Sequence, residues 1–341
     1  MQTPTLFARP KARVVAAALI ASLAAGCASH PQMVTRDQPG PCSASADQVV
    51  TLATLKLAYR QYGPRNGAPV ILEAGTGQKL VDWPPALINA LTAKGYRVTV
   101  FDNRDMGCST HLTNAGPPDF GKILTAMGSG KTPPVAYTLD DLAADTAGLM
   151  DALHIPKANI VGVSQGAIVA EMFAADYPER TLSLTAIAPN SGNKAIPVPA
   201  NPKRFAGLPP APPAGAPQAD IVAYKIANSK ALQSVTHPRS DEELRAIAAV
   251  NIARSYDPDA SGRQSAAALV TPDLRQKLKG ITAPTVVIQG AEDPLIPRAM
   301  AEDVAQSVPG ARLVVIDGMG HDLPDAVAPE IVSAIASVAR H

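Results

Sequence analysis

A serine stands between two glycines in the stretch Gly162-Val163-Ser164-Gln165-Gly166. A short apolar run, residues 159–163, leads into it, and a helix-like run, residues 166–176, follows it. The corner residue of a sharp strand-to-helix turn projects clear of both elements, and larger side chains two positions away would collide. Free N–H groups at the start of the helix can stabilise an oxyanion. The pattern predicts that Ser164 is a nucleophile that attacks a carbonyl carbon; the alternative is an ordinary turn.

A serine hydroxyl needs a base to take its proton, and the base needs an acid to orient it. His321 ends a glycine-lined loop after the apolar run 312–316, so it is the predicted base, with a purely structural histidine as the alternative. Asp293 follows the apolar run 285–288 and is the predicted acid. The adjacent Glu292 is the rival, but its side chain is expected to point the other way.

Two backbone N–H groups are expected to bind the oxyanion. One belongs to Gln165, directly after the serine. The other belongs to Thr76, in a loop where Gly75 and Gly77 allow the backbone to approach a substrate. Such a donor typically lowers the barrier by about 3 kcal/mol.

Short apolar strands alternate with longer helical patterns through most of the chain. The predicted strands are 69–73, 97–101, 159–163, 182–187, 285–288 and 312–316, and the predicted helices are 85–94, 139–153, 166–176, 297–308 and 326–339. Two further runs, 49–54 and 55–62, are consistent with a hairpin. This alternation predicts an α/β fold with a doubly wound, mostly parallel sheet.

The alternation is interrupted once, between about residues 190 and 279. A proline-studded stretch, 195–217, is followed by helical patterns at 219–228 and 242–256. Ser240 and Glu243 match a capping box at the start of the second. We expect an insertion that lies as a cap over the end of the sheet. A flexible linker would suit the prolines but not the capped helix.

The motifs, in the order Ser164, Asp293, His321, resemble those of the α/β-hydrolase superfamily over roughly residues 55–339. The stretch from Phe101 to Thr110 is similar to a loop of the branch that contains aclacinomycin methylesterase, as is Trp83-Pro84-Pro85 upstream. The fold implied is the α/β-hydrolase fold with a cap insertion.

The same resemblance bears on three further residues. Asp102 and Arg104 are expected to form a buried ion pair that braces the active-site loops. Ala74 stands where many members carry a histidine before the glycine. This change keeps the backbone donor but removes any part that the histidine plays in substrate preference.

The implied function is hydrolysis of a small carboxylic ester through an acyl-enzyme on Ser164. Carbon–carbon bond hydrolases share the same three residues and stay an alternative. A serine at position 164 argues against the dehalogenases and epoxide hydrolases of this fold, which use aspartate. An alternative of a different class is a ligand-binding envelope lipoprotein without catalysis.

Residues 1–26 resemble a bacterial lipoprotein signal peptide, with a basic head, a short apolar stretch and then Cys27. Lipid on Cys27, a tether over residues 27–47 and a hydrolase domain over 48–341 would anchor the protein in the cell envelope, facing the periplasm from the outer membrane. An ordinary signal peptide or an uncleaved anchor is the alternative. In that oxidising compartment, Cys42 and Cys108 either pair or remain buried thiols.

Composition limits the partners. The formal net charge is +1, which gives no electrostatic reason to expect nucleic acid. Neither metal-ligand spacing nor a nucleotide-binding glycine loop occurs, so we expect no metal and no cofactor. The expected partners are a small-molecule ester and, through Cys27, a membrane; the sequence does not indicate an oligomeric state.

Overall fold

The computed structural model describes Met1, Cys42 and residues 47–340. The predicted signal peptide, the lipidation site Cys27 and most of the tether lie outside the described residues. Among the described residues, no helix is both long enough and apolar enough to cross a membrane.

One eight-stranded sheet organises the domain, in the order β1-β2-β4-β3-β5-β6-β7-β8. The strands are β1 Gln48–Thr51, β2 Lys56–Tyr62, β3 Pro69–Glu73, β4 Arg97–Phe101, β5 Ala158–Val163, β6 Thr181–Ile187, β7 Thr285–Gly290 and β8 Arg312–Ile316. β2 pairs antiparallel with both β1 and β4, and the remaining pairs are parallel. The predicted α/β fold with a mostly parallel sheet is confirmed.

Helices cover both faces of the sheet because alternate strand residues point to opposite sides. Val70 and Leu72 of β3 join an apolar core beneath α1 and α10, whereas Ile71 joins the core on the other face. The first face carries α1 Pro85–Ala93 and α10 Ala328–Ala336, and the second carries α3 Leu139–Ala152, α4 Gln165–Asp176, α8 Arg275–Leu278 and α9 Arg298–Ser307.

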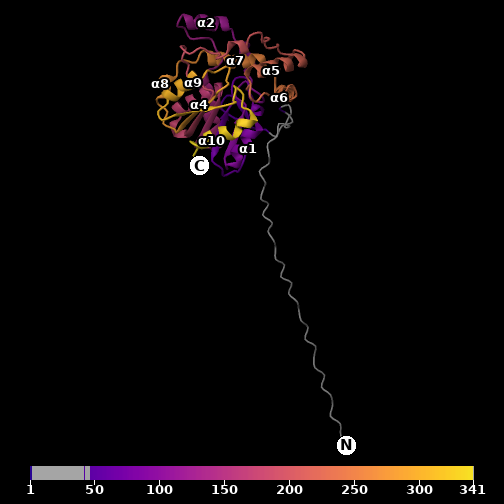
Figure 1. Ribbon diagram of the computed structural model, residues 1–341, viewed down its shortest axis with the longest axis vertical. Helices are drawn as coiled ribbons and strands as arrows, with labels where there is room; N and C mark the ends of the chain where they lie inside the picture. The colour runs from indigo at the N-terminus through magenta and orange to yellow at the C-terminus, as the bar shows by residue number, and fades with distance from the viewer. Residues whose placement is uncertain (2–41, 43–46, 341) are drawn as a thin grey trace. The chain divides into compact units, whose positions relative to one another are not determined.

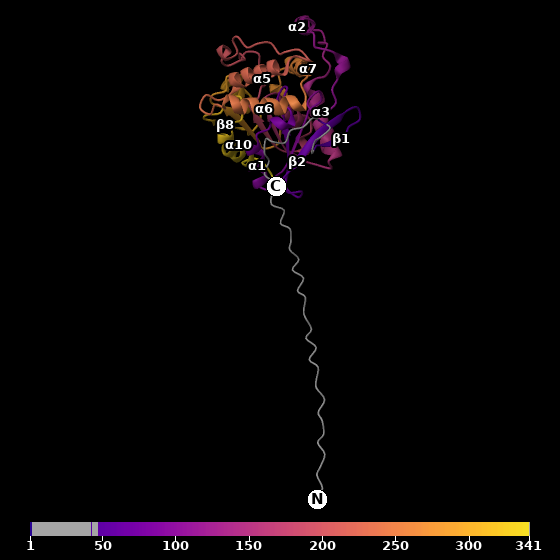
Figure 2. The same cartoon turned by 90° about the vertical axis from the view of Figure 1, so that its right-hand side faces the viewer.

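Between β6 and β7 the chain forms the segment that we call the cap segment, residues 190–279. It contains α5 Gln218–Leu232, α6 Asp241–Arg254 and α7 Pro258–Leu269, followed by α8. Figures 1 and 2 show α5, α6 and α7 together on one side of the domain, with α2 (Phe120–Gly128) lying further out. The capping box at α6 is present: Ser240 Oγ accepts from the Glu243 N–H, and Glu243 Oε2 accepts from the Ser240 N–H.

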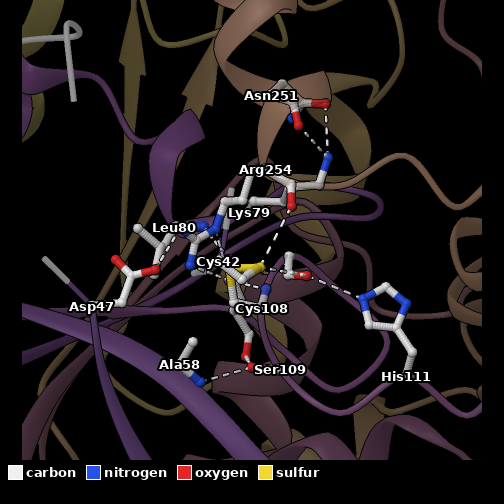
Figure 3. The surroundings of a disulfide bond; sticks show 12 residues. Cys42, Asp47, Ala58, Lys79, Leu80, Cys108, Ser109, His111, Asn251 and Arg254 are labelled. Atoms are coloured by element: carbon white, nitrogen blue, oxygen red, sulfur yellow. Dashed lines mark hydrogen bonds and ion pairs between the residues drawn. A yellow bond between two sulfur atoms is a disulfide. The ribbon is translucent and has the colours of Figure 1, made fainter. Parts of the chain in front are cut away.

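Cys42 and Cys108 form a disulfide, with 5.4 Å between their Cα atoms. The bond joins the chain ahead of β1 to the loop after β4 (Figure 3). The structure thereby decides between the paired and free thiols that the sequence left open.

Candidate active site

Ser164 occupies the sharp corner between β5 and α4, with φ 56° and ψ −123°. A Cβ atom on Gly162 would lie 2.0 Å from the carbonyl oxygen of Gly166. One on Gly166 would lie 2.1 Å from the carbonyl oxygen of Glu73. Both distances are far below van der Waals contact, so the predicted steric need for glycine on each side of Ser164 is confirmed.

Ser164, His321 and Asp293 form one line of hydrogen bonds. His321 Nε2 lies 3.1 Å from Ser164 Oγ, and His321 Nδ1 lies 2.8 Å from Asp293 Oδ2. The three residues follow β5, β8 and β7, and the carboxyl ends of parallel strands meet at one edge of the sheet. Asp293 is held in turn, because its Oδ1 accepts the N–H groups of Leu295 at 2.8 Å and Ile296 at 2.9 Å.

Glu292, the rival acid, points into the cap segment. One of its oxygens accepts from Ser234 Oγ and from the Val235 N–H, each at 2.8 Å. Thr236 also donates to this carboxylate through its hydroxyl and its N–H. Burial opposes ionisation of Glu292, but the hydrogen bonds from Thr236, Ser234 and Val235 outweigh it and lower its pKa to about 2. Asp293, and not Glu292, is therefore the carboxylate that contacts His321.

The loop after β3 runs close to Ser164, since a Cβ atom on Gly75 would lie 3.3 Å from Ser164 Cβ. Within the part of the chain that the structure describes, the N–H groups of Thr76 and Gln165 donate to no protein acceptor. Both of the predicted oxyanion donors are therefore free to bind a substrate oxygen.

Side chains fix the loop after β3 relative to Ser164, and this bracing was missed by the sequence analysis. Thr76 Oγ1 donates to Gln165 Oε1 at 2.6 Å, and Gln165 Nε2 donates to the carbonyl oxygen of Gln264 in α7 at 3.1 Å. Gln264 Oε1 accepts the Gly77 N–H at 2.8 Å. Gln165 and Gln264 are 4% and 1% exposed, so this link between α4, α7 and the loop is shielded from water.

The predicted ion pair between Asp102 and Arg104 is wrong. Arg104 turns toward α3, where its Nε lies 2.7 Å from Asp145 Oδ2 and its guanidinium lies over the ring of Tyr137. Asp102 instead accepts from Nε of Arg254, at the end of α6, at 2.8 Å. The resemblance of the loop suggested a pairing that the directions of the two side chains forbid.

Arg254 lies beside the Cys42–Cys108 disulfide (Figure 3) and binds a second carboxylate, with its Nη1 2.7 Å from Asp47 Oδ2. A further buried pair joins the same loop to α7, where Arg263 Nε lies 2.8 Å from Asp105 Oδ2. The loop after β4 therefore holds two helices of the cap segment through arginine–aspartate contacts.

A cavity of about 410 Å³ adjoins these groups. Its lining combines the loops at the sheet edge with α5, α6 and α7, and includes Thr76, Trp83, His321, Tyr224, Leu244 and Tyr256. A cavity of this size suits a small organic molecule, and it opens beside the imidazole and the oxyanion loop.

The fold and this site define the class of protein. Residues 68–325, about three quarters of the chain, match the family described as alpha/beta hydrolase fold, and the chain belongs to that family. It is an enzyme of the α/β-hydrolase superfamily.

The individual proteins that resemble this chain share only a minority of its residues. The chain is 27% identical over 316 residues to rhodomycin D methylesterase DauP of Streptomyces sp. (strain C5), covering 86% of this chain and 98% of the relative. Among solved structures, a hydrolase from Pseudomonas aeruginosa PA01 is similar with a TM-score of 0.62 and 25% identity, covering 86% of this chain and 98% of the other. The meta-cleavage product hydrolase CumD of Pseudomonas fluorescens IP01 shares the fold, with a TM-score of 0.62 and 21% identity. The similarity covers 85% of this chain and 97% of CumD.

Proposed function

We propose that this enzyme is a carboxylesterase that cleaves small esters through an acyl-enzyme on Ser164. The observation that carries the proposal is the unbroken line from Ser164 Oγ through His321 to Asp293, with contacts of 3.1 and 2.8 Å. A hydroxyl, an imidazole and a buried carboxylate in this order are the parts needed for acyl transfer.

In the proposed reaction, His321 Nε2 takes the proton of Ser164 as its Oγ attacks the ester carbonyl. The carbonyl oxygen becomes an oxyanion and accepts the N–H groups of Thr76 and Gln165. His321 then protonates the leaving alcohol while the carbon–oxygen bond to it breaks, which leaves the acyl group on Ser164. Water attacks this acyl-enzyme with the same imidazole as base, and the acid departs. Asp293 accepts the hydrogen bond from the Nδ1–H of His321 throughout and stabilises the imidazolium.

Two observations support a small ester as the substrate. The cavity of about 410 Å³ is lined by α5, α6 and α7 of the cap segment as well as by the loops at the sheet edge, and its volume suits a small ester. The relative DauP is named as a methylesterase, which acts on an ester with a one-carbon alkyl group. The likeness to a meta-cleavage product hydrolase concerns the fold alone, so it does not favour carbon–carbon bond cleavage here.

The proposal is tested by labelling the purified protein with a fluorophosphonate and mapping the modified residue by mass spectrometry. Ser164 should carry the label, and Ser164→Ala should lose both the label and ester hydrolysis while keeping its circular dichroism spectrum. Across p-nitrophenyl esters from acetate to palmitate, kcat/KM should peak at short chains. A label on another serine, with Ser164→Ala still active, would refute the nucleophile. A steady rise of kcat/KM to palmitate would refute the small-substrate assignment.

We also infer, from the sequence alone, that Cys27 is the lipidated N-terminus of the mature protein and anchors it in the cell envelope. Cys27→Ser should release active enzyme into a soluble fraction, because a serine at this position cannot carry the thioether-linked lipid. Intact-mass analysis of the membrane-bound protein checks this directly, and an unlipidated cysteine or cleavage at another site would contradict it.

A further inference from the structure

Two lysines line the cavity from different parts of the fold. Lys79 follows the oxyanion loop and is only 4% exposed. Lys225 belongs to α5 in the cap segment and is partly buried. The cavity beside His321 is therefore lined by ammonium groups from both the core of the domain and the cap segment.

The two ammonium groups differ in their contacts. Lys79 Nζ donates to the carbonyl oxygen of Asn251 at 3.1 Å and to its Oδ1 at 2.8 Å (Figure 3). Lys225 makes neither a hydrogen bond nor an ion pair with any residue that the structure describes. Burial lowers the pKa of Lys79 to about 8, and repulsion from Lys225 adds to that effect, so the two charges lie close enough to interact.

Asp82 attracts both lysines electrostatically, but one of its oxygens is already hydrogen-bonded to neutral groups. Its Oδ2 accepts the backbone N–H of Lys79 at 2.8 Å and Nδ2 of Asn251 at 2.6 Å. Most other charged side chains around the cavity are already paired: Arg239 with Asp322, Asp105 with Arg263, and Asp257 with His111. Asp102 also attracts Lys79, but it is paired with Arg254. Among the described residues, the charge of Lys225 therefore lacks a direct partner.

Filling the cavity would take the partly buried Lys225 ammonium further out of water, which is unfavourable unless a bound anion supplies its partner. We propose that the cavity takes esters whose acyl part ends in a carboxylate, which Lys225 binds directly and Lys79 attracts. Asn228 and Ser229, which also line the cavity from α5, offer neutral hydrogen-bonding groups beside Lys225. A neutral acyl chain of the same length would bury the Lys225 charge unpaired, so the arrangement also selects against such esters.

This inference rests on the proposed esterase function and names its substrate class. The test compares monomethyl adipate with methyl hexanoate, which share the methyl alcohol and the length of the acyl chain and differ in the terminal carboxylate. Methanol release gives kcat/KM for each. Wild type should prefer the charged ester, and Lys225→Met should lower the ratio of the two kcat/KM values about tenfold or more, as expected for a charged hydrogen bond.

Taking the ratio on each variant cancels any general loss of activity or folding. Lys203→Met removes the same charge from an exposed position of the cap segment that does not line the cavity, and it should leave the ratio within about twofold of wild type. An unchanged ratio in Lys225→Met, or a wild-type preference for methyl hexanoate, would overturn the carboxylate assignment while leaving the esterase proposal intact.

If neither ester is hydrolysed, a binding measurement still distinguishes the carboxylate site from the esterase function. Calorimetry of monomethyl adipate with Ser164→Ala should show binding that weakens about tenfold when Lys225→Met is added and stays unchanged when Lys203→Met is added. If this pattern appears but neither ester is cleaved by the wild type, the carboxylate site stands and the esterase function fails. If monomethyl adipate does not bind, or binds equally well without Lys225, the carboxylate site is refuted whatever the hydrolysis shows.

Discussion

Glu73 should be a neutral carboxylic acid at neutral pH, and Glu73→Gln should therefore change how stability depends on pH. Glu73 ends β3, directly before the oxyanion loop, and is 0% exposed. Thr146 Oγ1 lies 2.5 Å from its Oε1 and 3.1 Å from the carbonyl oxygen of Leu142. The single hydroxyl proton of Thr146 is shared between these two acceptors, so Thr146 supplies Glu73 with at most one weak donor, and burial dominates its ionisation.

The magnitude follows from the pKa of Glu73. Burial raises this pKa from 4.5 to about 8; the contact with Thr146 opposes the rise, and the charge of Asp145 adds to it. Because the folded-state pKa is the higher one, the stabilisation is complete below about pH 4.5 and is lost as the pH rises to about 8. At about 1.4 kcal/mol per pH unit, this single group removes about 5 kcal/mol from the free energy of unfolding across that window.

Glutamine keeps the shape of Glu73, can accept from the Thr146 hydroxyl through its amide oxygen and does not titrate. We expect Glu73→Gln and wild type to differ by less than about 1 kcal/mol near pH 5. By pH 7 the variant should be more stable by about 3 kcal/mol, and the gap should widen further toward pH 8. Urea unfolding followed by circular dichroism at each pH measures the difference.

Glu242→Gln on the exposed start of α6 is the matched control, and as a surface substitution it should change the free energy of unfolding by no more than about 0.5 kcal/mol. Other buried acids such as Glu171, whose pKa burial also raises, contribute equally to wild type and variant and so cancel. Parallel pH profiles for wild type and Glu73→Gln, or a variant less stable than wild type at pH 8, would refute a neutral Glu73.

Three further outcomes are expected, for the acid that contacts His321, for the disulfide and for the buried Arg254. Asp293→Asn should lower kcat by roughly 10⁴-fold, whereas Glu292→Gln should lower it far less; the opposite ranking in an ester assay would reassign the acid. Cys108→Ser should reduce the free energy of unfolding by about 4 kcal/mol, because the disulfide links residues 66 apart, and reduced wild type should match it in urea unfolding. Arg254→Met should destabilise by about 3–5 kcal/mol, because it leaves buried carboxylates unpaired; a loss below about 1 kcal/mol would contradict this.

Local patterns predicted the sheet closely because each parallel strand is a short apolar run. β3, β4 and β8 begin and end at the predicted residues. β7 continues two residues beyond its predicted end, to Gly290, because Gln289 and Gly290 pair with β8. Pairing with a neighbouring strand, which no local pattern contains, decided where that strand ends.

α7 was missed because its buried face combines small alanines with polar side chains and lacks large apolar residues. Arg263 and Gln264 are buried there, 3% and 1% exposed, and both bind groups on other elements. A search for hydrophobic periodicity passes over such a helix. A local signal was present, since Asp257 caps the helix by accepting the Ala260 N–H and Pro258 occupies the first turn.

The loop after β4 illustrates how a motif can be recognised while its role is misassigned. Its carboxylates do not pair within the loop: Asp102 binds Arg254 of α6, and Asp105 binds Arg263 of α7. Both helices line the cavity, and the disulfide at Cys108 ties the same loop to the chain ahead of β1. The motif therefore fixes the position of the cap segment relative to the loops around Ser164. We infer that substitutions in this loop change the preference among substrates more than they change the reaction rate at Ser164. They displace α6 and α7, which line the cavity, and leave His321 and Asp293 in place.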